Sequence, residues 1–297
     1  MRNIPIPTIG WWSADVKMKI FKTRKEFQQY ALELKRSGKS IALVPTMGFL
    51  HDGHMSLIDI ARKKADVVMV SVFVNPTQFA PHEDFDRYPR DFDGDVAKCA
   101  EHGADVIYAP EATEMYRDDA STWVEETVLS RPLCGKSRPT FYRGVTTVVA
   151  KLFLLVQPDF AVFGLKDAQQ CFVIQRMVRD LNFPIEIIPA PLVRDADGLA
   201  LSSRNRYLSA DERNRALAIH RSLLAAKSRI MADKNAIKAA AAEAAAAITA
   251  AGGKVDYVDV LDCETMEYPE AGAKKIILAA AAFFGTTRLI DNEIFEI

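Results

Sequence analysis

The sequence carries almost no net charge. Its 297 residues include 38 lysines and arginines against 39 aspartates and glutamates, which gives a formal net charge of −1. A general nucleic-acid-binding protein normally shows a clear basic excess, because contacts to phosphate dominate its affinity. We therefore expect no nucleic-acid partner, although a balanced total leaves room for local basic pockets.

Long apolar runs are also missing. No uninterrupted apolar stretch approaches the roughly 20 residues that a membrane-spanning helix needs. The segment from Met1 to Trp12 is interrupted by Pro5, Pro7 and Gly10 and contains no apolar run of leader length. The sequence therefore predicts no membrane association and no secretory leader.

Cysteine is scarce and scattered. The four cysteines, which form no CxxC pair, are Cys99, Cys134, Cys171 and Cys263. Such spacing is typical of reduced thiols, and it disfavours both a disulfide framework and a thiolate zinc site. We therefore expect a cytoplasmic protein.

In the first two thirds of the chain, apolar runs of strand length alternate with amphipathic stretches of helix length. The expected helices span 23–37, 55–65, 91–101, 144–156 and 167–180, and the expected strands span 40–44, 67–74, 105–108, 160–163 and 185–189. Alternation of this kind is typical of βα units on a parallel sheet. It predicts an α/β fold with a Rossmann-like, doubly wound parallel sheet.

The pattern changes after about residue 192. Asp195, Asp197 and Gly198 favour a turn, and Ser209 with Glu212 has the spacing of a capping box at a helix start. Two helices and strand-like stretches at 255–261, 276–279 and 287–290 follow. We therefore predict a second, smaller α+β domain and divide the chain into residues 1–192 and residues 193–297.

The most informative stretch, 44–54, reads Val-Pro-Thr-Met-Gly-Phe-Leu-His-Asp-Gly-His and leads from a buried strand into a helix. Gly48 and Gly53 permit close backbone approach, and the helix N-terminus presents free amides to a phosphate. His51 and His54, three residues apart, can both donate to phosphate oxygens and stabilise charge that develops there. The stretch predicts a nucleotide site at the carboxyl end of a strand.

Two other interpretations of this motif stay open at this point. Two histidines at this spacing could ligate a metal ion, although no third ligand is placed nearby. They could also be polar surface residues without a function.

The same stretch carries a family resemblance. Pro45 to Gly48 followed by His-x-Gly-His resembles the signature of the pantothenate synthetases, which are pantoate–β-alanine ligases. The His-x-Gly-His element also marks a wider nucleotidyltransferase superfamily that includes the class I aminoacyl-tRNA synthetases. Further blocks similar to the ligase family lie at 72–79, 88–90, 138–139, 144–145, 163–170 and 202–208. The resemblance therefore extends along most of the chain.

The resemblance implies a two-step ligation. ATP and pantoate would form pantoyl adenylate and pyrophosphate, and β-alanine would then displace AMP to give pantothenate. Residues 1–192 would bind ATP and pantoate, and residues 193–297 would form a C-terminal lid. The resemblance also implies a homodimer, and Mg²⁺ is expected to accompany ATP.

The resemblance assigns roles to individual residues. The catalytic group is His51, His54 and Lys166, and the group for pantoate and β-alanine is Met47, Asn75, Gln78 and Gln170. The ATP group is Thr46, Met47, Gly48, His51, Gly53, His54, Gly164, Lys166, Asp167, Ser202, Ser203 and Arg204. The residue types suit these roles, because glutamine amides both donate and accept and a lysine supplies a point charge for phosphate. Arg138 is similar to a family arginine on the phosphate side.

The metal assignment is less complete. Asp95 matches a family aspartate after the Tyr-Pro-Arg block and is the candidate carboxylate for Mg²⁺, with an exposed aspartate on a helix face as the alternative. The sequence departs from the family pattern at three places, which are Phe141-Tyr142, Leu165 and Gly94. The last lies beside Asp95, where an acidic residue is common.

Other functions fit parts of the pattern. A sibling adenylyl or cytidylyl transferase would release a nucleotide conjugate instead of AMP. A nucleotide-binding or RNA-associated module is a second alternative, which the near-neutral charge disfavours. The smaller domain could also serve only as a structural element and an oligomer contact.

Overall fold

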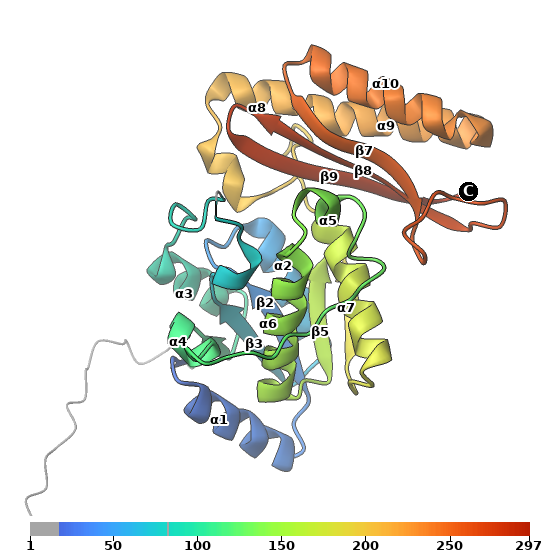
Figure 1. Cartoon of the computed structure of the whole chain (residues 1–297). Coiled ribbons are helices and arrows are strands. Elements are labelled where there is room, and N and C mark those ends of the chain that lie inside the picture. Colours follow the sequence, from blue (N-terminus) through green and yellow to red (C-terminus); the bar gives the residue numbers. More distant parts are fainter. Residues whose placement is uncertain (1–17, 82) are drawn as a thin grey trace, which may run out of the picture.

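The computed structural model describes residues 18–81 and 83–297 of the chain. They form two units, one around a six-stranded sheet and one around a three-stranded sheet (Figure 1). The expectation of no leader concerns Met1 to Trp12, which lies outside the described residues.

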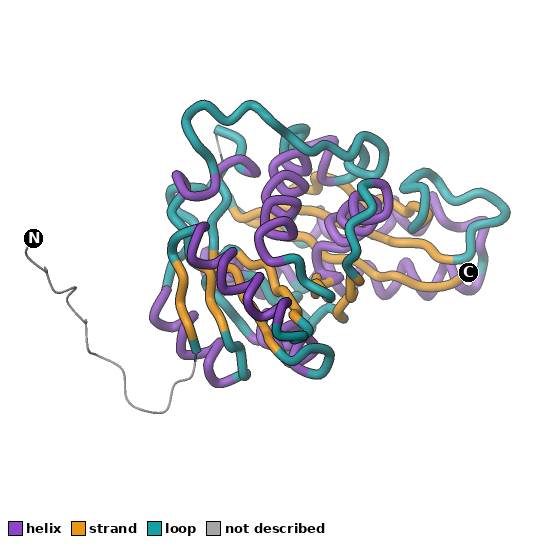
Figure 2. Tube along the Cα trace, turned by 90° about the horizontal axis from the view of Figure 1, so that it is seen from below, coloured by secondary structure: helices purple, strands orange, loops and turns teal. Residues whose placement is uncertain are grey.

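All six strands of the larger sheet run parallel. They are β1 (Lys19–Phe21), β2 (Ile41–Thr46), β3 (Val67–Val72), β4 (Val106–Tyr108), β5 (Phe160–Gly164) and β6 (Glu186–Ala190). Their order across the sheet is β1-β4-β3-β2-β5-β6. The chain therefore winds outward from β2 through β3 and β4 on one side and through β5 and β6 on the other. Figure 2 shows the strands side by side with helices next to them.

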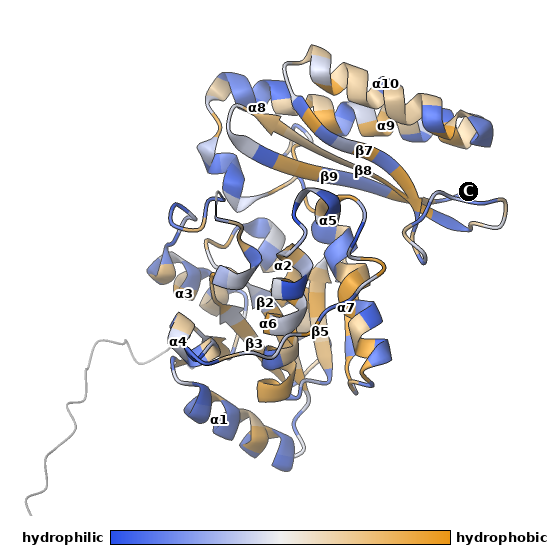
Figure 3. Cartoon of the chain, in the orientation of Figure 1, coloured by the Kyte–Doolittle hydropathy of each residue, from blue (hydrophilic) through white to orange (hydrophobic). Residues whose placement is uncertain are grey.

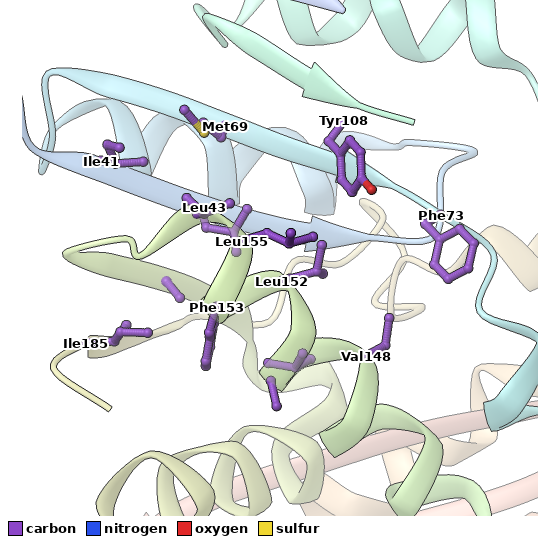
Figure 4. Close-up of a cluster of buried hydrophobic side chains, with 14 of the residues drawn as sticks. Ile41, Leu43, Met69, Phe73, Tyr108, Val148, Leu152, Phe153, Leu155 and Ile185 are labelled. Atoms are coloured by element: carbon purple, nitrogen blue, oxygen red, sulfur yellow. The ribbon is translucent and has the colours of Figure 1, made fainter. Parts of the chain in front are cut away.

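Helices cover both faces of this sheet. They are α1 (Arg24–Arg36), α2 (Asp52–Arg62), α3 (Phe92–Glu101), α6 (Phe141–Val156) and α7 (Ala168–Asp180), with the short α4 (Ala112–Met115) and α5 (Cys134–Ser137) between α3 and α6. Alternation along β2 separates two cores, because Ile41 and Leu43 pack with α1, α6 and α7 whereas Ala42 and Val44 pack with α2 and α3. Figure 4 shows the first of these cores. The hydrophilic faces of α1 and α7 point outward (Figure 3).

The C-terminal unit is an α+β structure. Its antiparallel strands, in the order β7-β8-β9, are β7 (Lys254–Asp262), β8 (Lys275–Phe284) and β9 (Thr287–Glu296). They follow the helices α8 (Ala210–Ala216), α9 (Ala218–Ala232) and α10 (Ile237–Ala250). The helices α9 and α10 lie along this sheet (Figure 1). Leu223 of α9 and Ile248 of α10 are buried in the core of the unit with residues of the strands. No helix within residues 18–81 and 83–297 is both long and apolar enough to cross a membrane.

The predicted fold class is confirmed, and the differences concern the ends of elements and elements that were not predicted. α2 begins at Asp52 and α6 at Phe141, each three residues before its predicted start. The C-terminal unit has three helices instead of the two expected, because a break at Leu217 separates α8 from α9. β8 and β9 are longer than predicted, and β1 was not predicted at all.

The two units share a contact region. Leu133 and Tyr142 of the larger unit pack in one cluster with Ile277 of β8. The Ser137 hydroxyl of α5 also donates to Asp256 Oδ1 of β7 at 2.7 Å. The smaller unit is therefore seated on the larger one and not merely tethered to it.

Candidate active site

The strand order creates a switch point between β2 and β5. These two strands are neighbours, and the connections that follow them leave in opposite directions along the sheet. Crevices at such a point, outside the carboxyl ends of the strands, are where open α/β sheets bind ligands. The segment 47–51 follows β2 and the segment 165–167 follows β5, so the two predicted catalytic loops meet at the switch point.

The first loop is held in an unusual backbone conformation. Gly48 has φ +79° and Phe49 has φ +51°, both in the left-handed region. The carboxylate of Asp95 accepts from the amides of Phe49 at 2.9 Å and Leu50 at 2.7 Å. Lys98 donates to the Leu50 carbonyl at 2.6 Å. These contacts from α3 fix the turn that leads into the histidines.

Both histidines lie at the start of α2. His51 is the N-cap residue, and the two imidazole centroids are 4.1 Å apart. The backbone N–H of His51 donates to His54 Nδ1 at 3.3 Å. A Cβ on Gly53 would lie 2.9 Å from His51 Cε1, so glycine is needed for the imidazole to sit where it does.

The surroundings keep both imidazoles neutral. Burial, together with the positive charge of Lys166, lowers the pKa of His51 to about 4. Burial, followed by the neighbouring His51, holds the pKa of His54 well below its ordinary value. At neutral pH each ring therefore has one N–H donor and no charge. The buried Nδ1 of His51 has no hydrogen-bond partner within the described residues.

The second loop brings a positive charge to the same place. Lys166 and Asp167 belong to a short 3₁₀ turn after β5. The Lys166 ammonium lies 3.3 Å from Asp167 Oδ2. Gly164 ends the strand, and a Cβ there would meet nothing closer than Leu57 at 3.8 Å. The protein itself therefore leaves room for a Cβ at Gly164, whereas a Cβ at Gly53 would clash with His51.

One cavity of about 810 Å³ joins these loops. Its size is in the range of pockets that hold nucleotide-sized ligands. It is lined by every predicted catalytic, substrate and ATP residue except Gly48, and by Arg138. The structure thus brings together residues that are as far apart in the chain as Thr46 and Arg204.

Amide side chains form a second part of the cavity wall. Asn75 Nδ2 donates to Gln78 Oε1 at 3.0 Å and to the Gly144 carbonyl at 3.2 Å, and Gln78 Nε2 donates to Met47 Sδ at 3.1 Å. A Cβ on Gly144 would lie 2.5 Å from the carbonyl oxygen of Thr77, so α6 can approach this turn only with glycine there. Three of the predicted substrate residues therefore form one connected group.

The two adjacent glutamines of α7 have different positions. Gln169 is buried, donates to the carbonyls of Leu129 and Pro132, and accepts from the amide of Cys134. Its amide thus holds the segment before α5 in place. Gln170 also lines the cavity and is only partly buried.

The segment after the sheet approaches the loop that carries the two histidines. Arg204 forms a two-pronged ion pair with Asp84, with nitrogen–oxygen distances of 2.9 and 2.8 Å. The hydroxyl of Ser203 donates to the Phe49 carbonyl at 3.1 Å, and Ser202 accepts from the Arg204 amide. This segment of the C-terminal unit therefore contacts the loop that precedes the histidines.

The match to a known family decides the identity of the chain. The family model described as pantoate-beta-alanine ligase matches residues 19–294. The chain belongs to the pantoate–β-alanine ligase family.

Individual relatives and solved structures of this ligase family agree. Pantothenate synthetase of Thermotoga neapolitana is 49% identical over 278 residues, which cover 93% of this chain and 99% of the relative. That of Geobacter sulfurreducens is 49% identical, with 93% and 98% covered. The crystal structure of pantothenate synthetase from Thermus thermophilus has a TM-score of 0.84 at 42% identity, with 93% and 99% covered.

A further solved structure of the ligase family contains ligands. It is the pantoate-beta-alanine ligase from Francisella tularensis complexed with beta-gamma ATP and beta-alanine. Its TM-score to this chain is 0.76 at 32% identity, and 93% of this chain and 97% of that one are covered.

The structure gives Asp95 a position that the sequence analysis did not foresee. Its side chain is buried, with 2% of the residue exposed, and both carboxylate oxygens accept from backbone amides. It does not line the cavity. Within residues 18–81 and 83–297, no three His, Cys, Asp or Glu side chains are grouped to hold a metal ion. The alternative of an exposed aspartate on a helix face is wrong, because Asp95 is buried.

Several residues of this ligase-family site were missed by the sequence analysis. They line the cavity or pair with predicted residues, and they are Glu83, Asp84, Tyr257, Arg288 and Asn292. Glu83 pairs with Arg138, whose guanidinium also donates to the Gln78 carbonyl at 3.1 Å. For two of them the sequence held a signal, because Arg288 and Asn292 lie an even number of positions apart on β9 and therefore on the same face of the strand.

Proposed function

We propose that the cavity at the switch point is where the chain carries out the ATP-dependent ligation of pantoate with β-alanine. The observation that supports this most is the meeting of the two neutral histidines, Lys166 and the Asn75–Gln78 amide group around one cavity. Side chains suited to binding phosphate and side chains suited to binding a carboxylate therefore line the same cavity. The product is pantothenate, with AMP and pyrophosphate released.

In the first step, the pantoate carboxylate attacks the α-phosphorus of ATP. Gln78, Gln170, Asn75 and Met47 orient pantoate so that its carboxylate lies in line with that phosphorus. An acyl–phosphate bond forms while the bond to pyrophosphate breaks, and the bonding electrons leave with pyrophosphate. Negative charge therefore grows on the phosphate oxygens during this step.

The phosphate side supplies donors for this charge. His51 and His54 each donate one N–H, and Lys166 adds a positive charge close to both rings. Thr46, Gly53, Gly164 and Asp167 form the ATP subsite, with Asp167 accepting from the ribose hydroxyls. Gly48 contributes through the left-handed turn that leads to His51. Ser202, Ser203 and Arg204 close over the triphosphate. Asp84 occupies Nε and Nη2 of Arg204, so a phosphate can accept from Nη1 while this ion pair persists.

In the second step, the unprotonated amine of β-alanine attacks the acyl carbon of pantoyl adenylate. The carbon–oxygen bond to AMP breaks, and the amine proton is lost to solvent or to AMP. Neither step needs a covalent intermediate with the enzyme, and no side chain is required as a nucleophile.

Magnesium enters as part of the substrate MgATP. Mg²⁺ is commonly held by substrate phosphates and water with few protein ligands. The described residues contain no ready-made carboxylate cluster, and Asp95 already accepts two backbone amides. We therefore assign Asp95 to holding the loop before His51 and no step to a protein-bound metal.

Asp95→Asn separates these two assignments. An asparagine keeps one acceptor oxygen but turns an N–H towards an amide, so the turn at Phe49 loosens and AMP formation should fall about tenfold. The Mg²⁺ concentration that gives half-maximal rate should not change. The measurement is AMP release against Mg²⁺ concentration, with Asp91→Asn, an exposed N-cap residue of the same helix, as the matched control. Full rescue of Asp95→Asn by high Mg²⁺ would restore the metal-ligand assignment.

The remaining expectations concern the whole protein. We propose a homodimer in the cytoplasm, with residues 1–192 binding ATP and pantoate and residues 193–297 acting as the lid. The contacts of Ser203 and Arg204 with the larger unit support a lid that acts through the 202–204 segment.

The test of the function is the release of AMP and pyrophosphate from ATP. We expect AMP and pantothenate only when pantoate and β-alanine are both present. A chain that binds ATP but forms no AMP with both substrates would contradict the proposal. It would favour a sibling nucleotidyltransferase, which transfers the nucleotide to another acceptor and keeps it in the product.

A further inference from the structure

A side chain from the C-terminal sheet fastens the loop that carries Lys166. Asn292 lies on β9, and its Nδ2 donates to the backbone carbonyls of Leu165 at 2.9 Å and Lys166 at 3.1 Å. Asn292 is buried. A side-chain amide has two N–H donors, and both are used here. Asn292 therefore lines the cavity without a donor to spare for a phosphate.

The alternation of side chains along β9 places Asn292 at this loop. Leu289 and Phe295 belong to the core under the helices of the C-terminal unit, and Glu293 pairs with Lys227 of α9. Residues at even positions point to the opposite face of the strand. That face looks towards the larger unit, and its residues Arg288, Ile290 and Asn292 line the cavity.

The position of Asn292 is itself anchored. Its backbone N–H donates to Asp291 Oδ1 at 2.7 Å. Asp291 is buried and accepts from both terminal nitrogens of Arg194, at 2.6 and 2.9 Å. A bidentate pair of this kind is strong and directional. The Lys166 loop is thus attached to a part of the C-terminal unit that is held by its own hydrogen bonds and ion pair.

We propose that Asn292 is a positioning residue for Lys166, acting through the two carbonyls that it binds. The inference rests on the proposed role of Lys166 in the reaction. Among the described residues, the Lys166 ammonium has one polar side-chain contact, to Asp167 at 3.3 Å. Its place in the cavity therefore depends mainly on its backbone. A displacement of about 1 Å in a reacting group can cost about 10²-fold in rate.

Two substitutions separate positioning from space filling. Asn292→Ala leaves the two carbonyls to water, whereas Asn292→Asp keeps the shape and turns a carboxylate towards them. Positioning predicts that kcat for AMP formation falls about tenfold in Asn292→Ala and about 10²-fold in Asn292→Asp, while the KM for ATP changes less. If Asn292 only filled space, the isosteric aspartate would be the milder change. That order of the two variants would overturn the proposal.

A double-mutant cycle tests whether the effect passes through Lys166. In a Lys166→Met chain the target of the positioning is gone, so adding Asn292→Asp should slow AMP formation by less than about twofold. A further loss as large as in the wild-type background would overturn the proposal.

The failure of the proposed function would show itself differently. A wild-type chain that forms no AMP rejects the ligase activity, and the contact of Asn292 can still be measured by hydrogen exchange of the amides at 165–168. Both substitutions should speed this exchange, and Asn292→Asp should do so more strongly. Unchanged exchange in both variants would overturn the inference about Asn292 whatever the activity.

Discussion

Replacing His51 by alanine is expected to slow formation of pantoyl adenylate by about 10²- to 10³-fold, the usual effect of removing one donor to developing charge. The imidazole lies at the N-cap of α2, lines the cavity and is 4.1 Å, centroid to centroid, from that of His54. Its N–H interacts most strongly once charge has accumulated on the phosphate, so kcat should fall more than the KM for ATP rises. Single-turnover formation of the adenylate without β-alanine measures this step directly.

The matched control for His51→Ala is His102→Ala. His102 lies at the end of α3 with its Nδ1 2.8 Å from Asp59 Oδ1, and it does not line the cavity. The control should form adenylate at the wild-type rate. Equal rates for wild type and His51→Ala would contradict the assignment of His51 to phosphate stabilisation.

The same substitution has an expected effect on stability. Burial lowers the pKa of His51 from 6.5 to about 4 in the folded chain. Between these values the unfolded chain binds a proton at His51 that the folded chain does not bind, so the free energy of unfolding falls as the pH falls through this window. His51→Ala should therefore lose less stability than the wild type between about pH 6.5 and about pH 4. Denaturant titrations of both chains in this range measure the difference.

The parallel sheet could be predicted because its pattern is local. Buried strands such as β2 and β5 read as short apolar runs, and each of these two is followed by an amphipathic helix. The end of β6 was also predicted to within one residue, because prolines at 189 and 191 interrupt the apolar run. Pro189 itself lies inside the strand, which is at the edge of the sheet, where a missing N–H is tolerated. The start of α2 was placed too late because its N-cap is His51, a residue type that is not a usual helix-start signal.

The pairing of side chains across the site could not be predicted. Arg204 and Asp84 are 120 residues apart, and Asn292 and Leu165 are 127 apart. No local period or motif records which of several arginines or amides will meet which partner after folding. Asp95 illustrates the same limit, because its place in a family motif suggested a metal ligand, whereas its carboxylate accepts amides 45 and 46 positions earlier in the chain.

Gln78→Glu is expected to lower kcat/KM for pantoate by about 10³-fold. Like charges brought together at a desolvated site cost several kcal/mol, which corresponds to a loss of this size. Glutamate has nearly the same shape, and one of its oxygens can still accept from Asn75 Nδ2, as Gln78 Oε1 does at 3.0 Å. The other oxygen takes the place of Nε2, which donates to Met47 Sδ at 3.1 Å and is the proposed donor to the pantoate carboxylate, so a donor becomes a negative charge. The KM for ATP should stay close to that of the wild type.

Gln175→Glu provides the matched control, because Gln175 lies on α7 and does not line the cavity. Wild-type values of kcat/KM for pantoate in both variants would contradict the assignment of Gln78. The decisive comparison starts from preformed pantoyl adenylate and β-alanine. In the adenylate the carboxylate of pantoate has become an acyl phosphate. The negative charge then lies on the phosphate, away from the carboxylate introduced at position 78. The Gln78→Glu chain should therefore convert the adenylate to pantothenate with a much smaller loss than it shows from pantoate and ATP.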